Sequence, residues 1–276
     1  MSENSKQVVH FNVMKGFTTA QSNEHQRNWT ERAWENAMLH GNYDRSRERL
    51  NFEITKGGKI RPIDTSASIP KRMAASLAER GIKDPNQGLE IPKYRTVVDF
   101  ILSGSKEQMR KLAFGNQTVV FEPGDNAENY GLKRMPEIEH WAKDMYTFMC
   151  DKYGEENIIG FYVHCDETTP HLHCTMMPIK NGKFAFKELF AGKDKYEFSM
   201  NTKRLHNELA KVNALHGLGR GTAVSETGAR HRPTEEYRRH LDAWCASIEE
   251  EVSQHQKALA ELRGEVSVAE RRVKGL

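Results

Sequence analysis

The chain has 276 residues, of which 37% are hydrophobic and 29% charged, and its formal net charge is +3. This size allows one folded core with an appendage, and so small a charge excludes a histone-like protein, so nucleic-acid contacts would need local basic clusters. No apolar run approaches the ~20 residues that span a bilayer, and the four cysteines show no Cys-x-x-Cys spacing. We therefore expect a cytoplasmic protein with reduced thiols and no membrane segment.

The N-terminal region predicts a strand followed by one helix. Apolar residues occupy every second position over residues 7–14, the pattern of a strand with one buried face. Ser22 is a candidate N-cap for a helix that runs to about Leu39, in which His25 and Arg32 would share one side. Taken alone, this position would make His25 an ordinary solvated helix residue.

The next segment carries arginines at alternate positions before a strand-like pattern. These arginines are Arg45, Arg47 and Arg49. Because a guanidinium binds phosphate oxygens through two parallel hydrogen bonds, the segment is a candidate contact surface for a DNA backbone. The alternative is an ordinary solvated edge strand.

Apolar periodicity and end signals predict several further elements: a helix over 68–80, a strand over 118–121, a helix over 136–153, a hairpin turn at 181–182 and a helix over 199–215. The hairpin follows directly on a histidine-bearing strand. We therefore expect that strand to be paired antiparallel.

Residues 158–177 carry the strongest chemical signal. Two strand-like runs flank a turn at Pro170. On such strands His171 and His173 face the same way, and the turn brings His164 beside them. Three neutral imidazoles bind a divalent ion and leave positions open for a substrate oxygen, as in catalytic metal sites. The alternative is a histidine-rich surface turn without a metal.

The C-terminal part predicts a basic loop and then a coiled coil. Residues 217–232 are rich in glycine and arginine, so Arg230 and Arg232 would either contact DNA or simply be solvated. Residues 241–276 follow heptad spacing, which favours self-association or a partner helix. Because the pattern reaches Leu276 without a stop signal, we expect a shortened chain or a longer natural helix.

The histidine segment also resembles a known family. Its string His164-x-Asp166-Glu167-x-Thr169-Pro170-His171-Leu172-His173 resembles the third motif of the Mob/Pre plasmid mobilisation relaxases, the MobV class of the HUH endonuclease superfamily. Ser46-Arg47-x-x-Leu50-Asn51-x-Glu53 is similar to the second motif. His25 resembles the first-motif histidine, whose companion arginine is either Arg27 or Arg32. The spacing from His25 to Leu50 is several residues longer than is usual in the family.

This resemblance implies an α+β relaxase domain over residues 1–240, with a central antiparallel sheet that carries the histidines and has flanking helices, followed by the coiled coil. It implies a bacterial enzyme that binds transfer-origin DNA in single-stranded form and nicks that strand during plasmid mobilisation. The cut would leave a covalent 5′-phosphate link to the protein, and the ends would later be rejoined. The cofactor would be a divalent metal, manganese or magnesium first, although imidazole also suits zinc, nickel and cobalt.

The resemblance also assigns roles to residues. His25 would be the nucleophile, with Tyr43 as its competitor, because the position after Asn51, a tyrosine in some relatives, is Phe52 here. Glu167, or else Asp166, would fix the tautomer of His25. The metal ligands would be His164, His171 and His173, and the DNA contacts would be Arg32, Arg47, Arg49, Asn51, Arg230 and Arg232.

Two other functions fit the same residues. A hydrolase with a three-histidine metal centre would activate water against a small molecule, without DNA and without a covalent adduct. A metal-stabilised adaptor would bind DNA and never cut it.

Overall fold

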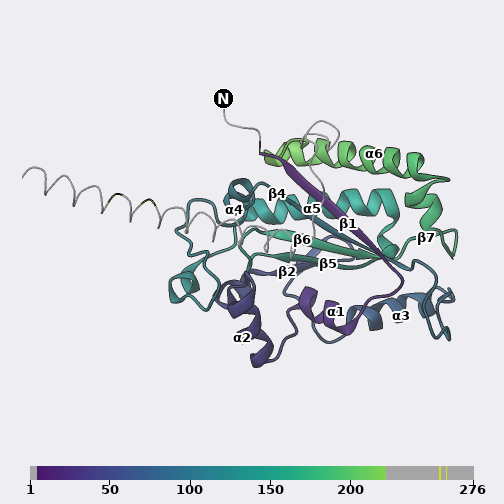
Figure 1. The fold of residues 1–276 in the computed structure, drawn as a ribbon, viewed down its shortest axis with the longest axis horizontal. Coiled ribbons are helices and arrows are strands. Elements are labelled where there is room, and N and C mark those ends of the chain that lie inside the picture. Colours follow the sequence, from purple (N-terminus) through teal and green to yellow (C-terminus); the bar gives the residue numbers. More distant parts are fainter. Residues whose placement is uncertain (1–4, 222–254, 256–258, 260–276) are drawn as a thin grey trace, which may run out of the picture. The chain divides into compact units, whose positions relative to one another are not determined.

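The computed structural model describes residues 5–221, together with His255 and Leu259 (Figure 1). The first compact unit of the chain ends at Gly221. Arg230, Arg232 and the predicted coiled coil lie outside the described residues, apart from His255 and Leu259, which are helical and exposed.

The described helices and strands, with short helical turns marked η, are, in chain order, β1 (Gln7–Met14), α1 (Thr19–Gln26), α2 (Glu31–His40), η1 (Arg45–Leu50), β2 (Phe52–Thr55), β3 (Lys59–Arg61), α3 (Ile69–Glu79), β4 (Val97–Gly104), α4 (Lys106–Phe114), η2 (Ala127–Gly131), α5 (Pro136–Tyr153), η3 (Glu155–Asn157), β5 (Ile158–His164), β6 (His171–Met176), β7 (Ile179–Lys180), β8 (Lys183–Phe184), η4 (Lys187–Ala191), α6 (Lys195–Asn213) and η5 (Ala214–His216).

A central antiparallel sheet with flanking helices, as predicted, organises the fold. Its strand order is β1-β4-β6-β5-β2-β3. The histidine strand β6 lies inside this sheet, between β4 and β5, and pairs antiparallel with both. Helices α4, α5 and α6 lie on one side of the sheet, and α1, α2 and α3 on the other (Figure 1).

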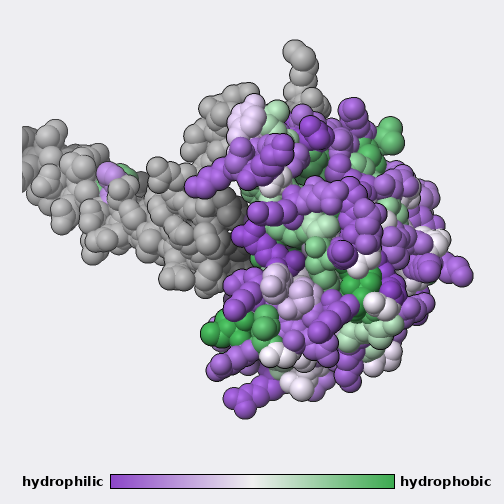
Figure 2. All heavy atoms as spheres, turned by 90° about the vertical axis from the view of Figure 1, so that its right-hand side faces the viewer, coloured by the Kyte–Doolittle hydropathy of each residue, from purple (hydrophilic) through white to green (hydrophobic). Residues whose placement is uncertain are grey.

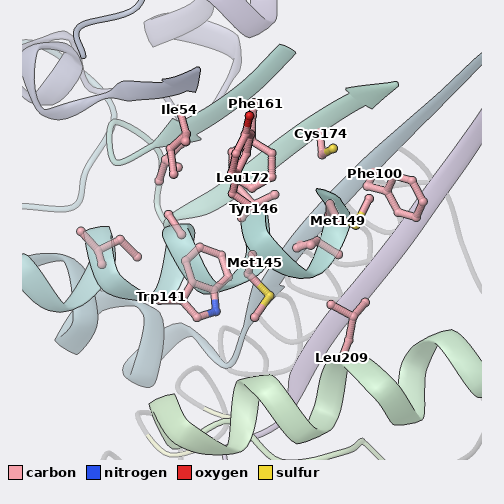
Figure 3. Close-up of a cluster of buried hydrophobic side chains, with 14 of the residues drawn as sticks. Ile54, Phe100, Trp141, Met145, Tyr146, Met149, Phe161, Leu172, Cys174 and Leu209 are labelled. Carbon is pink, nitrogen blue, oxygen red and sulfur yellow. The ribbon is translucent and has the colours of Figure 1, made fainter. Parts of the chain in front are cut away.

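The two faces of the sheet differ in polarity because successive side chains point to opposite sides. Phe100, Leu172 and Cys174 point into the main core, where Trp141 and Met145 of α5 pack between the sheet and α6 (Figure 3). The opposite face carries a second, smaller hydrophobic cluster that includes Val97 and Tyr162, together with the polar and titratable groups that form the site described below.

The predicted single helix over 22–39 is wrong. Thr18, not Ser22, caps α1, and Thr30 caps the separate helix α2. Between them Arg27 adopts a left-handed backbone with φ of 52°, which ends α1. His25 and Arg32 therefore lie on different helices.

The segment 118–121 is not a strand, contrary to prediction. The backbone N–H and C=O of Val120 bond to the side-chain amide of Asn129, at 3.0 and 2.8 Å, instead of to a neighbouring strand. The sequence patterns did not identify β4, which lies in the sheet between β1 and β6. Likewise α6 begins at Lys195 with Asp194 as its cap, ahead of the predicted Ser199.

The predicted hairpin turn is confirmed, with φ of 52° at Asn181 and 71° at Gly182. Its strands β7 and β8 form a separate small sheet, however. The antiparallel partners of the histidine strand are instead β4 and β5.

The described helices include none that is both long and apolar enough to cross a membrane. Figure 2, which views the molecule from the α3 and β7 side of Figure 1, shows a mainly hydrophilic surface with small hydrophobic patches. This surface agrees with the mean hydropathy of −0.75.

Candidate functional site

The three predicted histidines converge at one end of the β5–β6 pair. His164 is the last residue of β5 and lies opposite His171, the first residue of β6. The ring centroids of His171 and His173 are 5.0 Å apart. The ring centroid of His164 lies 5.3 Å from that of His171 and 5.1 Å from that of His173. Residues 165–170, which we call the site loop, join the two strands.

The arrangement of nitrogen atoms fits a divalent cation. One ring nitrogen from each histidine lies within 4.8 Å of the others. The Nε2 atoms of His171 and His173 are 3.2 Å apart. His164 donates its Nε2–H to the carbonyl of His25 at 2.8 Å, and its buried Nδ1 has no hydrogen-bond partner among the described residues. A lone pair left without a partner in a cluster of imidazoles is what a metal ligand requires.

Burial favours the neutral form of two of these histidines, His164 and His173. Burial, followed by the charge of Arg27, lowers the pKa of His164 well below its usual value. Burial, followed by His171, lowers the pKa of His173 in the same way. Neutral imidazole is the form that binds metal ions, so the fold prepares the ligands for a cation.

His25 joins this group from the last turn of α1. Its ring centroid is 3.9 Å from that of His173. Its Nε2 lies 3.6 Å from Oδ2 of Asp99, and its buried Nδ1 finds no hydrogen-bond partner within the described part of the chain. Burial and the neighbouring His173 lower the pKa of His25 well below 6.5, so the ring is neutral near pH 7.

Asp99 of β4 is the site residue that the sequence patterns missed. Besides its contact with His25, its Oδ2 lies 3.7 Å from Nδ1 of His173, and its Oδ1 accepts a hydrogen bond from Thr175 at 2.7 Å. Burial raises the pKa of the Asp99 carboxyl. The apolar run 97–102 could have indicated a strand here, but only the sheet order brings Asp99 to the histidines.

Glu167 and Asp166 bond to Arg27 and not to His25, which corrects the predicted pairing. Arg27 donates to both oxygens of Asp166, at 2.8 and 2.9 Å, and to Glu167 at 2.6 Å. Burial opposes ionisation of Asp166, but Arg27 outweighs it and holds the pKa of this carboxyl below its usual range. Of the two candidate first-motif arginines, Arg27 therefore lies at the site, while Arg32 is exposed on α2.

The arginine segment supports the site loop from inside. It folds as the tight helical turn η1, so alternate side chains diverge. Arg47 is fully buried, pairs with Asp44 and donates to the carbonyls of Cys165 and Glu167 at 2.8 and 3.0 Å. The structure thus places Arg47 inside the protein and not on a surface that DNA could contact.

The other two predicted DNA contacts of this segment are also engaged within the protein. The buried Asn51 accepts a hydrogen bond from the backbone N–H of Cys165 at 2.6 Å. Arg49 is exposed, but one of its nitrogens donates to three backbone carbonyls at the end of η2, those of Asn129, Tyr130 and Leu132. Asn51 therefore fixes the site loop, and Arg49 fixes the end of η2.

Tyr43, the competing nucleophile, lies beside the site loop. Its backbone forms an isolated antiparallel β-bridge with Glu167, and its hydroxyl donates a hydrogen bond to the Glu24 carboxylate at 3.1 Å. Burial, followed by the charge of Glu167, raises the pKa of Tyr43, which keeps the phenol protonated. A protonated phenol is a weak nucleophile.

Known proteins similar to this chain fall into one group by sequence. A family model described as plasmid recombination enzyme (Mob_Pre) matches residues 102–239, half of the chain. A plasmid recombination enzyme of Streptococcus agalactiae is 29% identical over 199 residues, which cover 71% of this chain and 32% of that protein. The type 1 enzyme of Staphylococcus aureus is 29% identical over 128 residues, 46% of this chain and 31% of its own. The chain thus spans about a third of the length of these relatives.

Solved structures show the same fold. The relaxase domain of MobM, in a manganese-bound crystal structure with plasmid pMV158 oriT DNA at pH 6.8, superposes with a TM-score of 0.59 and 22% identity, covering 86% of this chain and all of that one. A second such structure, at pH 6.5, gives a TM-score of 0.56 and 24% identity over 86% of this chain and 99% of that one.

Proposed function

This chain belongs to the Mob/Pre family of plasmid recombination enzymes, and from that premise we propose that it is a metal-assisted relaxase that nicks one DNA strand at a transfer origin. The observation that carries the proposal is the meeting of His25 with the three-histidine centre. The group combines a neutral nucleophile with an open ligand set for a divalent cation, manganese or magnesium first.

The residues divide the work as follows. A divalent ion bound by His164, His171 and His173 would polarise the scissile phosphate and neutralise its charge. Asp99 faces Nε2 of His25 at 3.6 Å, beyond hydrogen-bond length, so the charge of its carboxylate would favour the tautomer with the proton on that atom and the lone pair on Nδ1.

In the proposed step, the His25 nitrogen forms a bond to phosphorus while the bond from phosphorus to the 3′ oxygen breaks. The 3′ oxygen leaves with the bonding electrons and takes a proton from water, which gives a free 3′ hydroxyl. The 5′ phosphate stays on the protein as a phosphoramidate. Attack by the 3′ hydroxyl reverses the reaction and rejoins the strand.

Cleavage of end-labelled single-stranded oligonucleotides from the candidate transfer origin tests this function, with and without Mn²⁺ or Mg²⁺. We expect one metal-dependent cut with the unmodified protein and none with His171→Ala. His140→Ala removes an exposed histidine of α5 and should cut normally. Binding without cutting on a proven origin would instead support the adaptor, and hydrolysis of a small phosphodiester without DNA would support the hydrolase.

A further inference from the structure

Two half-exposed aromatic rings, Trp29 and Tyr43, pack together beside the site loop, and we call this pair the aromatic ledge. Their centroids are 5.1 Å apart and their planes meet at 86°. Trp34, which is 2% exposed, supports Trp29 edge to face at 4.9 Å. Neither Trp29 nor Tyr43 belongs to either hydrophobic core cluster of the described residues, so packing in those clusters does not account for these two rings.

The aromatic ledge is fixed to the site loop through both backbone and side chains. The Arg27 guanidinium lies 4.8 Å from the ring centroid of Tyr43 and 5.2 Å from that of Trp29. The same guanidinium donates hydrogen bonds to Asp166 and Glu167 of the site loop. Glu167 in turn lies 3.5 Å from Nε2 of His171. One carboxylate and one guanidinium therefore separate the aromatic ledge from the candidate metal ligands.

A glycine makes room for the ring of Tyr43. A Cβ atom at Gly41 would lie 2.5 Å from the carbonyl oxygen of Ala37 and 2.7 Å from Cδ2 of Tyr43. A side chain at Gly41 would therefore clash both with the backbone of α2 and with the ring. The position of Tyr43 thus depends on the absence of a side chain at this site.

The charges around the aromatic ledge favour a neutral ligand over a phosphate. Glu24 accepts the hydroxyl hydrogen bond of Tyr43, and Glu31 is exposed nearby in its pair with Arg45. Arg45 is paired with Glu31, and Arg27 is paired with Asp166 and Glu167, so neither arginine at the aromatic ledge is left to bind a phosphate. A nucleobase is uncharged, and every base offers a face for stacking on an aromatic ring.

We propose that the aromatic ledge binds one unpaired nucleobase of the strand whose scissile phosphate lies at the three-histidine centre. The inference rests on the proposed relaxase function. Because stacking tolerates any base, the aromatic ledge fixes the position of the strand and not its sequence. Trp29 and Tyr43 are accordingly positioning residues for the cut.

A double-mutant cycle that combines a protein substitution with an abasic site in the DNA tests this inference. Dissociation constants are measured at one salt concentration, in EDTA, for oligonucleotides with an abasic site moved along the origin strand. We expect Trp29→Leu to weaken binding of the intact strand by about 5- to 100-fold. One abasic position should weaken the unmodified protein equally and abolish the difference between the two proteins. Trp29→Phe should keep most of the affinity, and Gly41→Ala should lose part of it.

Leu39→Ala, at an exposed apolar position of α2, is the matched control and should bind normally. The aromatic ledge is only a scaffold if Trp29→Leu binds every oligonucleotide as tightly as the unmodified protein does. The same conclusion follows if Trp29→Leu binds all oligonucleotides more weakly by the same factor, so that no abasic position abolishes the difference in affinity between the two proteins. This failure differs from failure of the proposed function, in which the unmodified protein itself would not cut.

Discussion

Nε2 of His25 lies 3.6 Å from Oδ2 of Asp99, so a carboxylate from strand β4 faces a histidine from the first helix. The same carboxylate oxygen lies 3.7 Å from the candidate metal ligand His173. Asp99 therefore connects the proposed nucleophile with the proposed metal centre.

Asp99→Asn should weaken both functions while the fold persists. A neutral amide attracts an imidazole N–H less strongly than a carboxylate does, and loss of a carboxylate behind a metal-bound histidine typically costs 10- to 100-fold in metal affinity or activity. Titration calorimetry with Mn²⁺ and single-turnover cleavage measure the two effects. Asp151→Asn, on the exposed surface of α5, is the control. Unchanged metal affinity and cleavage in Asp99→Asn would remove Asp99 from the account.

Metal binding should raise the thermal stability of the protein only while the histidine centre is intact. A cation at about 100 times its dissociation constant adds about 2.7 kcal/mol to the free energy of unfolding. Melting curves with and without Mn²⁺ should therefore differ for the unmodified protein and for His140→Ala, and coincide for His164→Ala. An equal shift in His164→Ala would place the cation elsewhere.

Arg27→Met should destabilise the protein strongly because it leaves Asp166 buried without its counter-charge. Breaking a buried ion pair in this way costs about 3 to 5 kcal/mol of unfolding free energy, measured by urea denaturation. The double variant Arg27→Met, Asp166→Leu should recover much of the loss, since it leaves no buried charge unpaired between the two positions. Arg32→Met, at an exposed position of α2, should change stability by less than about 0.5 kcal/mol. A stability of Arg27→Met equal to that of Arg32→Met would contradict the proposed support role.

Cleavage should persist to lower pH than an ordinary histidine allows. Burial and His173 lower the pKa of His25 below 6.5, so its lone pair stays available as the pH falls through 6.5 and is lost only when the pH reaches the lowered pKa. Single-turnover rates from pH 4.5 to 8 at saturating Mn²⁺ should show an acidic limb centred below 6.5. A limb centred at or above 6.5 would contradict this assignment.

The convergence of His164, His171 and His173 was predictable because these candidate ligands lie on one strand-turn-strand segment, where alternation and a proline turn fix their relative placement. Asp99 was not, because its approach to His25 depends on β4 lying beside the histidine strand β6, a long-range pairing that no local pattern encodes. The apolar run 97–102 offered only the strand and not its place in the sheet.

The break at Arg27 shows why local patterns failed elsewhere. A left-handed backbone costs a non-glycine residue about 1 to 2 kcal/mol. Local bonds offset part of this cost, because the Arg27 side chain donates to the carbonyl of Glu24 at 2.6 Å and the N–H of Asn28 donates to that of Asn23 at 2.9 Å. The bonds of Arg27 to Asp166 and Glu167 offset it further in the folded chain, and no local pattern reveals these distant partners. Likewise Arg47 resembles a surface charge in sequence and is buried only because Asp44 and the site-loop carbonyls surround it.

Peptide mapping of the protein after reaction with a cleavable origin strand and Mn²⁺ identifies the residue that attacks the phosphate. We expect a nucleotide linked through its 5′ phosphate to the peptide that contains His25, and no adduct in His25→Ala, while Tyr43→Phe still forms it. An adduct on Tyr43, or one that survives in His25→Ala, would contradict the assignment of His25 as the nucleophile.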